Sequence, residues 1–219
     1  MDTTALINRL QKLETSWISD VSNDLRLLSH DIRPVNTDVK VAGIAYTIYS
    51  EGDIIPVLMG LHKSREGEVL VIDSCGSQGA MFGELVCWDG KGKKLNGIVT
   101  DGFCRDIKGI RNSGFPAFAS DVTPMVAGKS KLGKLQVELN LGGVTINPGD
   151  FILGDQDGVV IIDPGEAESI ISKAEKVREM EDKVFKKILE GIPFNDMLNT
   201  EEHYEKLKKG LPSTFKFTG

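Results

Sequence analysis

Apolar residues recur at helical spacing near both ends of the chain. Residues 6–13 and 18–28 each predict a short N-terminal helix. Residues 166 to about 190 form one long pattern, with an apolar stripe and dense Lys and Glu elsewhere. The stripe comprises Ile170, Ala174, Val177, Val184 and Ile188. We expect amphipathic helices at both ends, the long one being a solvated arm or an oligomer contact.

Between these helices the pattern changes to short β runs punctuated by glycine. Residues 39–45, 68–73 and 97–101 predict strands, and helices are expected at 53–62, from Glu84, and through Arg111. Further β runs lie at 116–120, 136–139, 144–146, 151–153 and 159–162. Repeated strand, loop and helix units predict a layered α/β fold with its sites beyond the strand ends. We expect one domain over residues 1–165 and a helical extension over 166–219 at an oligomer interface.

Composition narrows the classes of function. With 219 residues and 40% hydrophobic content the chain can bury a large core, and its net charge of −6 offers no surface for a polyanion, so nucleic acid is not expected as a ligand. The three cysteines show no CxxC spacing, which favours a reducing cytoplasm over a disulfide framework. No apolar signal segment and no run of 18 apolar residues occurs, so neither export nor membrane insertion is expected.

A glycine-rich segment over residues 74–83 first suggests a nucleotide site. Its glycines do not form G-x-G-x-x-G, and Gly128-Lys129-Ser130 is not a phosphate loop because Thr123 stands where the upstream glycine is required. What remains is a loop that allows close backbone approach and leads into a helix over residues 83–86. Free amides at a helix start bind carboxylates or phosphates, although a tight turn without a ligand is the alternative.

The next predicted strand brings Asp101, Arg105 and Asp106 to the same edge of the sheet. Arginine presents a planar fork that fits a carboxylate, and aspartate is a hard oxygen ligand for Mg²⁺ or Mn²⁺. The adjacent pair therefore indicates an anion beside a metal ion. A surface ion pair, or a helix N-cap by Asp106, is the simpler alternative.

The motifs at these positions together resemble one family over roughly residues 20–165. They are Gly67-Glu-Val-Leu-Val-Ile-Asp73, Gly76-Ser77, Ala80-x-Phe-Gly-Glu-Leu85, Gly97-Ile-Val-x-Asp-Gly-x-x-Arg-Asp106, Gly114-Phe-Pro-x-Phe-Ala119, Thr123-Pro124, Pro148-Gly-Asp150 and Asp155-x-Asp-Gly-Val-Val160. This set resembles the family that joins 4-hydroxy-4-methyl-2-oxoglutarate aldolases to the regulator of ribonuclease activity A. The resemblance implies a swivelling β/β/α sandwich assembled as a homotrimer or hexamer, with active sites at subunit boundaries.

The resemblance also implies roles for individual residues. Arg105 binds the pyruvyl portion of the substrate and Asp106 ligates Mg²⁺. Glu84, in the segment that begins at Gly83, orders water on the metal, and the backbone amides of Leu85 and Val86 take the carboxylate. Family members carry either Asp or Glu at the position of Glu84, so the water geometry stays open.

A glutamate from the long C-terminal helix of the adjacent chain enters the site in the family's aldolases. Arg178-Glu-Met-Glu181 resembles the segment that carries it. Glu181 is the nearer match by spacing and Glu179 the second choice, and a solvated helix glutamate is the alternative. We also expect Asp101 to support the loop or the surroundings of the metal.

The chemistry agrees with these roles. Cleavage of 4-hydroxy-2-oxo acids and decarboxylation of oxaloacetate both pass through pyruvate enolate, which a chelated metal stabilises. A Schiff-base lysine is the other aldolase strategy, but Lys91, Lys93, Lys94 and Lys108 lie in polar runs. Cys104 has no histidine nearby in sequence, and His30, His62 and His203 show no ligand spacing.

We therefore predict a lyase, a metal-dependent class II aldolase with oxaloacetate decarboxylase side activity. The main alternative is a non-catalytic regulator of ribonuclease activity that acts by binding another protein. A paralogue that acts on another 2-oxo acid or a sugar acid is a third possibility. The long helix over residues 166–190, found in the aldolase group, favours an enzyme.

Overall fold

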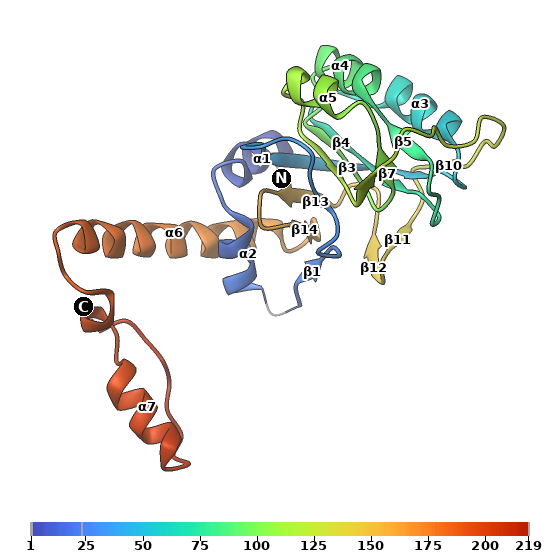
Figure 1. Ribbon diagram of the computed structural model, residues 1–219. Helices are drawn as coiled ribbons and strands as arrows, with labels where there is room; N and C mark the ends of the chain where they lie inside the picture. The colour runs from blue at the N-terminus through green and yellow to red at the C-terminus, as the bar shows by residue number, and fades with distance from the viewer. Residues whose placement is uncertain (1, 23, 219) are drawn as a thin grey trace. The chain divides into compact units, whose positions relative to one another are not determined.

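The computed structural model describes residues 2–22 and 24–218 (Figure 1), and the chain divides into two compact units, residues 1–174 and 175–219. The first unit is built on a mixed sheet with the strand order β1-β14-β13-β3-β4-β6-β8-β2, and β10 pairs with β3. Its strands are β1 (Arg26–Leu27), β2 (Arg33–Pro34), β3 (Val41–Tyr49), β4 (Glu68–Asp73), β6 (Gly97–Thr100), β8 (Ala117–Ala119), β10 (Lys134–Leu135), β13 (Phe151–Gly154) and β14 (Val159–Ile162). The confirmed fold class is an α/β sandwich with N-terminal helices and a long C-terminal helix.

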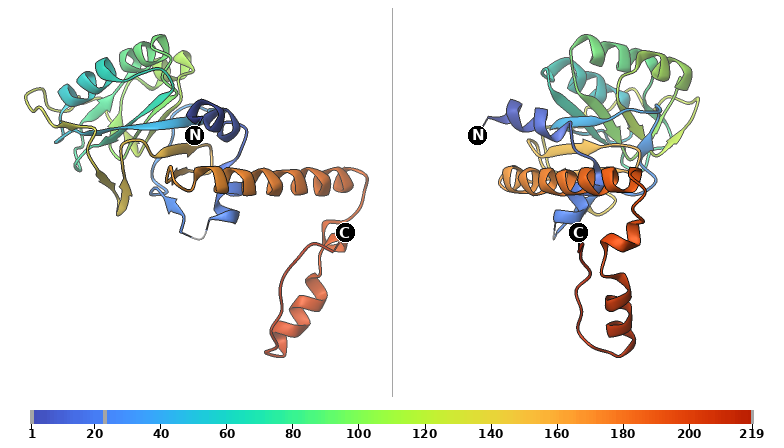
Figure 2. Two further views of the ribbon diagram at one scale, coloured as in Figure 1. Left: turned by 180° about the vertical axis from the view of Figure 1, so that it is seen from behind. Right: turned by 90° about the vertical axis from the view of Figure 1, so that its left-hand side faces the viewer.

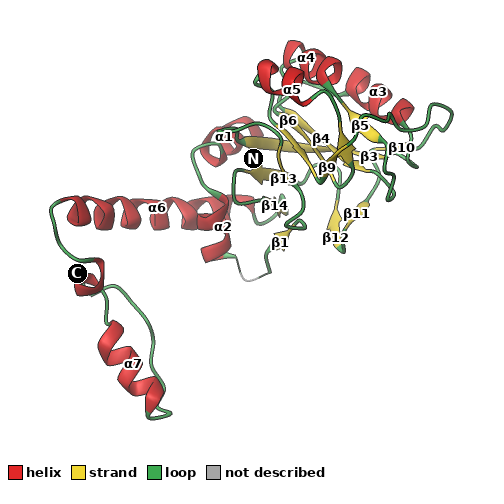
Figure 3. Ribbon diagram, viewed as in Figure 1, coloured by secondary structure: helices red, strands yellow, loops and turns green. Residues whose placement is uncertain are grey.

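Helices cover one face of this sheet, as Figure 3 shows for α3, α4 and α5. The helices of the first unit are α1 (Thr3–Leu10), α2 (Thr15–Val21), α3 (Ile54–Lys63), α4 (Glu84–Gly92) and α5 (Ile107–Ser113), and α6 (Ala167–Leu189) begins in it. Alternate residues of β4 point to opposite faces: Leu70 and Ile72 pack under these helices, whereas Val69 and Val71 pack against the β11–β12 hairpin side. Both faces of the central strands are therefore buried.

A small parallel sheet extends the central one beyond its carboxyl ends. It consists of β5 (Ala80–Phe82), β7 (Phe103–Cys104) and β9 (Asp121–Val122), which follow β4, β6 and β8 along the chain. Because three parallel neighbours of the central sheet each continue into this small sheet, the segments after them are held side by side. The glycine-rich segment is thus partly a strand.

A hairpin and the terminal helices cover the other face. The hairpin pairs β11 (Leu139–Leu141) with β12 (Val144–Ile146). A third apolar cluster joins α1, α2 and the first turns of α6 to β13 and β14. Figure 2 shows α1 and the start of α6 lying along these strands.

Two predictions of secondary structure were wrong. The second N-terminal helix was expected to reach residue 28, but it ends at Val21, and Arg26–Leu27 instead pair antiparallel with β14. This pairing is held by Arg26, whose guanidinium donates to the buried carboxylate of Asp150 at 2.8 Å. The predicted strand at 136–139 is replaced by β10 and β11 on either side, because Gln136 adopts a left-handed backbone with φ of 53°.

The second unit contains the rest of α6, a 3₁₀ turn over Phe194–Met197, and α7 (Thr200–Lys208). Its C-terminal segment returns to Asn199, whose side chain accepts from the Lys216 amide and donates to the Thr214 carbonyl. Within residues 2–22 and 24–218, no helix is long and apolar enough to cross a membrane.

Candidate active site

A cavity of about 270 Å³ lies where the small sheet meets the helix starts. Four segments line it: the start of α3, the β5–α4 junction, the β7–α5 junction, and the chain that follows β9. Its lining residues are Ile54, Leu58, Ala80, Phe82, Gly83, Leu85, Val86, Arg105, Asp106, Val126 and Lys129. The structure therefore brings together Gly83, Leu85, Val86, Arg105 and Asp106, which the sequence analysis had assigned to one site.

Arg105 and Asp106 occupy the junction between β7 and α5. Asp106 stands at the N-cap position of α5 with a left-handed backbone, φ 60° and ψ 43°, and its side chain makes no capping hydrogen bond. Its carboxylate Oδ2 instead lies 3.6 Å from Nε of Arg105, and both side chains remain partly exposed, at 47% and 41%. The capping alternative is thus not observed, whereas the ion pair with Arg105 is, and both partners of this pair line the cavity. Left-handed backbone at a non-glycine residue commonly marks a functional position.

Gly83 makes this arrangement possible. A Cβ atom added there would lie 2.6 Å from Oδ2 of Asp106 and 3.1 Å from Cγ of Arg105. The backbone is held at this distance because the Arg105 amide donates to the Phe82 carbonyl at 3.1 Å. Any side chain at position 83 would therefore displace the aspartate carboxylate.

The start of α4 contributes backbone donors. Gly83 is its N-cap and makes no side-chain cap, so the first amides of the helix have no intrahelical acceptor. Val86 is buried, whereas the Leu85 side chain is 82% exposed, although both residues border the cavity. These amides and the positive end of the helix dipole favour an anion beside Arg105.

Glu84 lies in the first turn of α4 but is not among the residues that line the cavity. Its carboxylate packs over Gly109 of α5, at a distance that leaves no room for a Cβ atom there. Glu84 therefore lies between the two helices whose starts border the cavity, and its acid–base or water-ordering role stays a prediction.

Asp101 is placed beside the cavity rather than in it. Its Oδ1 accepts from the Ser74 amide at 2.7 Å, which ties the loop after β6 to the loop after β4. Burial raises the pKa of Asp101, against the hydrogen bonds from Ser74. This position matches the loop-supporting role, and direct participation in catalysis stays a prediction.

Glu179 and Glu181 belong to the second unit, in the part of α6 beyond Ala174. The expected contribution of Glu181 concerns a neighbouring chain, so it remains a prediction.

Sequence reasoning missed Lys129 and the apolar wall. Lys129 lines the cavity, and Ile54 and Leu58, one turn apart on α3, form an apolar surface with Val126. Lys129 had been considered only as part of a failed phosphate-loop pattern. The sequence offered only a lysine flanked by Gly128 and Ser130. Its place beside the cavity could be recognised only once the fold showed which segments lie next to it.

The cavity suits a metal ion that is held jointly with a substrate. Asp106 is the one aspartate or glutamate carboxylate among the lining residues, and the described residues contain no group of three or more His, Cys, Asp or Glu that could form a closed cage. Mg²⁺ commonly takes one or two protein carboxylates and fills its remaining positions with water and substrate oxygens. The donor set therefore fits a Mg²⁺-type ion and not a structural zinc site.

The two buried cysteines do not supply a nucleophile. Cys87 and Cys104 are buried, and burial raises the pKa of each thiol to about 12. A thiol with so high a pKa is not ionised at neutral pH. Cys104, inside the recognised motif, is therefore a packing residue.

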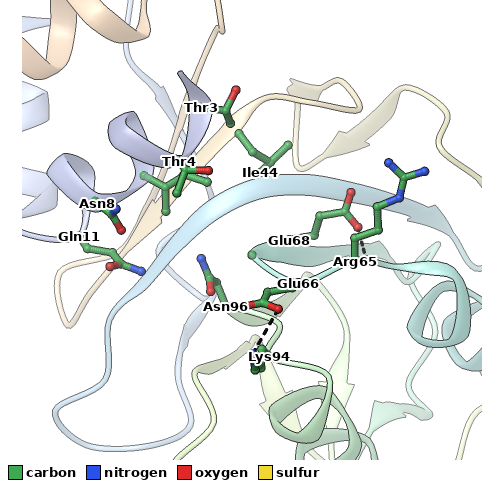
Figure 4. Close-up of a pocket in the computed structure, with 12 residues that line it drawn as sticks. Thr3, Thr4, Asn8, Gln11, Ile44, Arg65, Glu66, Glu68, Lys94 and Asn96 are labelled. Atoms are coloured by element: carbon green, nitrogen blue, oxygen red, sulfur yellow. Dashed lines mark hydrogen bonds and ion pairs between the residues drawn. The ribbon is translucent and has the colours of Figure 1, made fainter. Parts of the chain in front are cut away.

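A larger cavity of about 550 Å³ lies at the opposite, amino-terminal edge of the central strands, between α1 and the chain before β4 and β6 (Figure 4). Its charged side chains pair with near neighbours: Lys94 with Glu66, and Glu68 with the Arg65 amide. The start of α1 borders it, but the side chain of Asp2 already accepts from the amides of Thr4 and Ala5 at that helix start. The smaller cavity is the one that carries recognisable chemistry.

Comparison with known proteins identifies a family and several relatives that are similar to this chain. The sequence model of the RraA-like family, described as Aldolase/RraA, matches residues 15–161. A protein of Halalkalibacterium halodurans, provisionally named 4-hydroxy-4-methyl-2-oxoglutarate aldolase, is 36% identical over 172 residues, which cover 78% of this chain and 82% of that protein.

Two solved structures share the fold. An uncharacterised protein from Pseudomonas syringae superposes with a TM-score of 0.77 over 88% of this chain and 96% of its own, at 22% identity. The RNA-processing inhibitor RraA from Thermus thermophilis superposes with a TM-score of 0.65 over 69% of this chain and 93% of its own, at 27% identity.

Proposed function

The chain belongs to the RraA-like family, and from this premise we propose that it is a lyase: a divalent-metal-dependent aldolase that cleaves 4-hydroxy-2-oxo acids to pyruvate. The observation that carries the proposal is the cavity in which Arg105, Asp106 and the α4 helix start converge around Gly83. A relative that is 36% identical carries the provisional name of such an aldolase.

Each wall of the cavity has a role in binding the pyruvyl end of the substrate. The amides of Leu85 and Val86 would receive the 1-carboxylate, since anions are stabilised at a helix N-terminus. The guanidinium of Arg105 would lie beside the 2-oxo oxygen, and Asp106 would hold the metal. A Mg²⁺ or Mn²⁺ ion bound there supplies the Lewis acid that favours enolate formation.

During cleavage, negative charge develops on the 2-oxo oxygen, which would lie beside the guanidinium of Arg105. The C3–C4 bond breaks, the proton of the 4-hydroxyl group passes to water as C4 becomes a carbonyl carbon, and the electron pair of the broken bond forms the enolate of pyruvate, which water then protonates at C3. Arg105 stabilises the resulting oxyanion, a contribution worth on the order of 10²–10³ in rate for one preorganised donor. Decarboxylation of oxaloacetate forms the same enolate with CO₂ as the departing group, so we propose it as a side activity.

Lys129 extends this proposal to the substrate's far end. Among the described residues its ammonium has no ion-pair or hydrogen-bond partner, and Lys129 lines the cavity from a different segment than Arg105 does. A second carboxylate, such as that of 4-hydroxy-4-methyl-2-oxoglutarate, would supply the partner. We therefore favour dicarboxylic substrates over monocarboxylic ones.

The deciding experiment measures pyruvate release from 4-hydroxy-4-methyl-2-oxoglutarate and from oxaloacetate, with and without EDTA. We expect turnover that EDTA abolishes and added Mg²⁺ or Mn²⁺ restores. Full activity in excess EDTA, or a substrate adduct trapped by borohydride, would overturn the metal mechanism. The borohydride arm matters because Lys129 lies in the cavity, although an exposed lysine acts more readily as a cation than as an imine-forming amine.

A regulator of RNA processing is the second candidate, because the family includes such proteins and the Thermus structure named as an inhibitor shares this fold at 27% identity. That function predicts no turnover of either acid and measurable inhibition of a ribonuclease. The arrangement of Arg105 and Asp106 around an open cavity favours the enzyme.

We further propose a homotrimer or hexamer in which the sites lie at subunit boundaries. The exposed apolar side chains Leu58, Leu85 and Met125 lie on or next to the cavity-lining segments, where a neighbouring subunit would cover them.

A further inference from the structure

The segment that carries Lys129 has no regular secondary structure, yet it is fixed to the start of α3. The amide of Ile54 donates to the Gly128 carbonyl at 2.9 Å, and the amide of Gly128 donates to the Gly52 carbonyl at 3.1 Å. On the other side, the amide of Ala127 donates to the Ala80 carbonyl at 3.2 Å and the amide of Ala80 donates to the Met125 carbonyl at 2.8 Å, which ties the same chain to β5. Lys129 follows directly after these anchors.

Asp53 is the centre of this anchoring. It is 1% exposed, and its carboxylate accepts three backbone hydrogen bonds: Oδ1 from Ile55 at 2.9 Å, and Oδ2 from Ser130 at 2.7 Å and Lys131 at 3.0 Å. One oxygen therefore caps α3, while the other holds the two residues that follow Lys129.

The segment that carries Lys129 packs closely against the carboxylate of Asp53. A Cβ atom on Gly128 would lie 2.7 Å from Oδ2 of Asp53, so the segment approaches as near as glycine permits. Burial alone would raise the pKa of Asp53, but the amides of Ile55, Ser130 and Lys131 outweigh it and hold the pKa below its ordinary value. The carboxylate is thus charged at neutral pH, and charge-assisted hydrogen bonds are the strong ones.

We propose that Asp53 is a positioning residue for substrate specificity: it holds segment 128–131 on α3 so that the Lys129 ammonium meets the second carboxylate of a dicarboxylic 2-oxo acid. This inference rests on the proposed function and adds to it a residue that touches no substrate. The cavity's apolar wall, Ile54 and Leu58, belongs to the same helix that Asp53 caps. Asp53 therefore fixes the wall and the cation relative to each other.

The Asp53→Asn substitution separates the two functions of the side chain, which are capping α3 and binding the amides of Ser130 and Lys131. Asparagine is a good N-cap residue, so Oδ1 can still accept from Ile55. Its amide group then faces the amides of Ser130 and Lys131, two donors that it cannot accept from. Lys131→Ala is the matched control, because it removes the Nζ contact to the Glu51 carbonyl and the positive charge beside Asp53 but leaves the backbone hydrogen bonds to Asp53 intact.

The first measurement is hydrogen exchange of the intact protein, which needs no activity. We expect the amides of Ser130 and Lys131 to be protected from exchange in the wild type, and the amide of Ser130 to be protected in Lys131→Ala as well. In Asp53→Asn the amides of Ser130 and Lys131 should exchange at least about tenfold faster than in the wild type. Unchanged exchange in Asp53→Asn overturns the anchoring.

The second measurement compares 4-hydroxy-4-methyl-2-oxoglutarate with 4-hydroxy-2-oxopentanoate, which has the same pyruvyl end and no second carboxylate. Asp53→Asn should raise KM for the diacid about tenfold with little change in kcat, and leave the monoacid unaffected. Lys129→Ala should do the same, and the double variant should be no worse than Lys129→Ala alone, because both changes remove one interaction. Additive losses, or equal losses on both substrates, overturn the positioning role.

The two measurements distinguish failure of the inference from failure of the proposed function. If the wild type cleaves neither acid, the proposed function falls and takes the specificity role with it, while the exchange experiment still decides whether Asp53 anchors the segment. If the wild type cleaves the diacid and Asp53→Asn behaves like the wild type, the inference alone is wrong.

Discussion

Two carboxylates, that of Asp106 in the cavity and that of Glu84 beside it, lie directly over glycines. Asp106 packs over Gly83, and Glu84 packs over Gly109 on the neighbouring helix. In each pair a Cβ atom on the glycine would occupy the space that the carboxylate fills. The glycine is therefore part of the site, because it sets how closely the acid can approach the backbone opposite.

Gly83→Ala should abolish most activity without unfolding the protein. The added methyl would lie 2.6 Å from Oδ2 of Asp106, so the metal-binding oxygen must move, and we expect kcat/KM to fall at least about 10²-fold. Gly92→Ala is the control, because it lies in the same helix with nothing within 4 Å of its Cβ position. Equal activity of Gly83→Ala and Gly92→Ala would show that Asp106 does not need its observed place.

Arg105→Lys should be nearly as damaging as Arg105→Ala. A lysine ammonium is a point charge and does not reproduce the planar fork that meets both a carboxylate and an oxyanion. The fold should survive both changes, since the Arg105 side chain is 41% exposed. If Arg105→Lys keeps more than about half of the wild-type kcat/KM, a difference of only about 0.4 kcal/mol, the proposed role is wrong.

At the scale of elements, one recognised motif proves to be structural. Asp155, in the turn between β13 and β14, accepts from the backbone amide of Thr15 at 2.7 Å and from its hydroxyl at 2.8 Å. Both residues are buried, at 6% and 4% exposed. The turn is therefore locked to the start of α2, which places the N-terminal helices on the sheet.

Asp155→Asn should destabilise the first unit by about 1–3 kcal/mol at pH 7, as expected when a buried hydrogen-bonded charge loses its partners. Denaturant unfolding measures this, with the exposed Asp157→Asn as the control. Kinetic constants at low temperature should change little, because Asp155 does not line the cavity. A loss for Asp157→Asn equal to that for Asp155→Asn would contradict the lock.

The contact between Asp155 and Thr15 also predicts that the free energy of unfolding depends on pH. Burial alone would raise the pKa of Asp155, but hydrogen bonds from Thr15 and Asp157 outweigh it, so the folded-state pKa lies below its ordinary value of 3.8. A depressed folded-state pKa gives stability that is present above the unfolded-state value and is lost as the pH falls through the folded-state value. The free-energy difference between wild type and Asp155→Asn should therefore shrink below about pH 4, whereas a constant difference would argue against a charged lock.

At the scale of the whole molecule, the proposed site is shared between chains. Glu181 lies on α6, in the second unit. We predict that Glu181→Ala lowers kcat without dissociating the oligomer. Mixing it with Arg105→Ala should then restore part of the activity, through sites that combine two intact contributions.

Light scattering and verified subunit exchange are the controls for this mixing experiment. An active monomer, or no regain of activity after exchange, would rule out the shared site. Glu179→Ala serves as the comparison variant on the same helix, because it tests whether position 181 is the one that matters.

The sequence by itself determined the elements with strong periodicity and the site residues that lie in one motif. The strand Glu68–Asp73, the helix after Asp53 and the long helix near residues 167–189 follow from local patterns of burial and capping. Arg105 and Asp106 are adjacent in the chain, and Gly83 to Val86 form one helix start, so the resemblance located both groups.

Only the tertiary structure decided what depends on contacts between distant segments. Residues 26–27 became a strand because β14 offers them a partner, and β5 pairs with β7 to bring Gly83 under Asp106. Lys129 reaches the cavity because Asp53, 76 residues earlier, binds the segment that follows it. Such pairings leave no periodic trace in the sequence, since their energy comes from backbone hydrogen bonds and close packing across the fold.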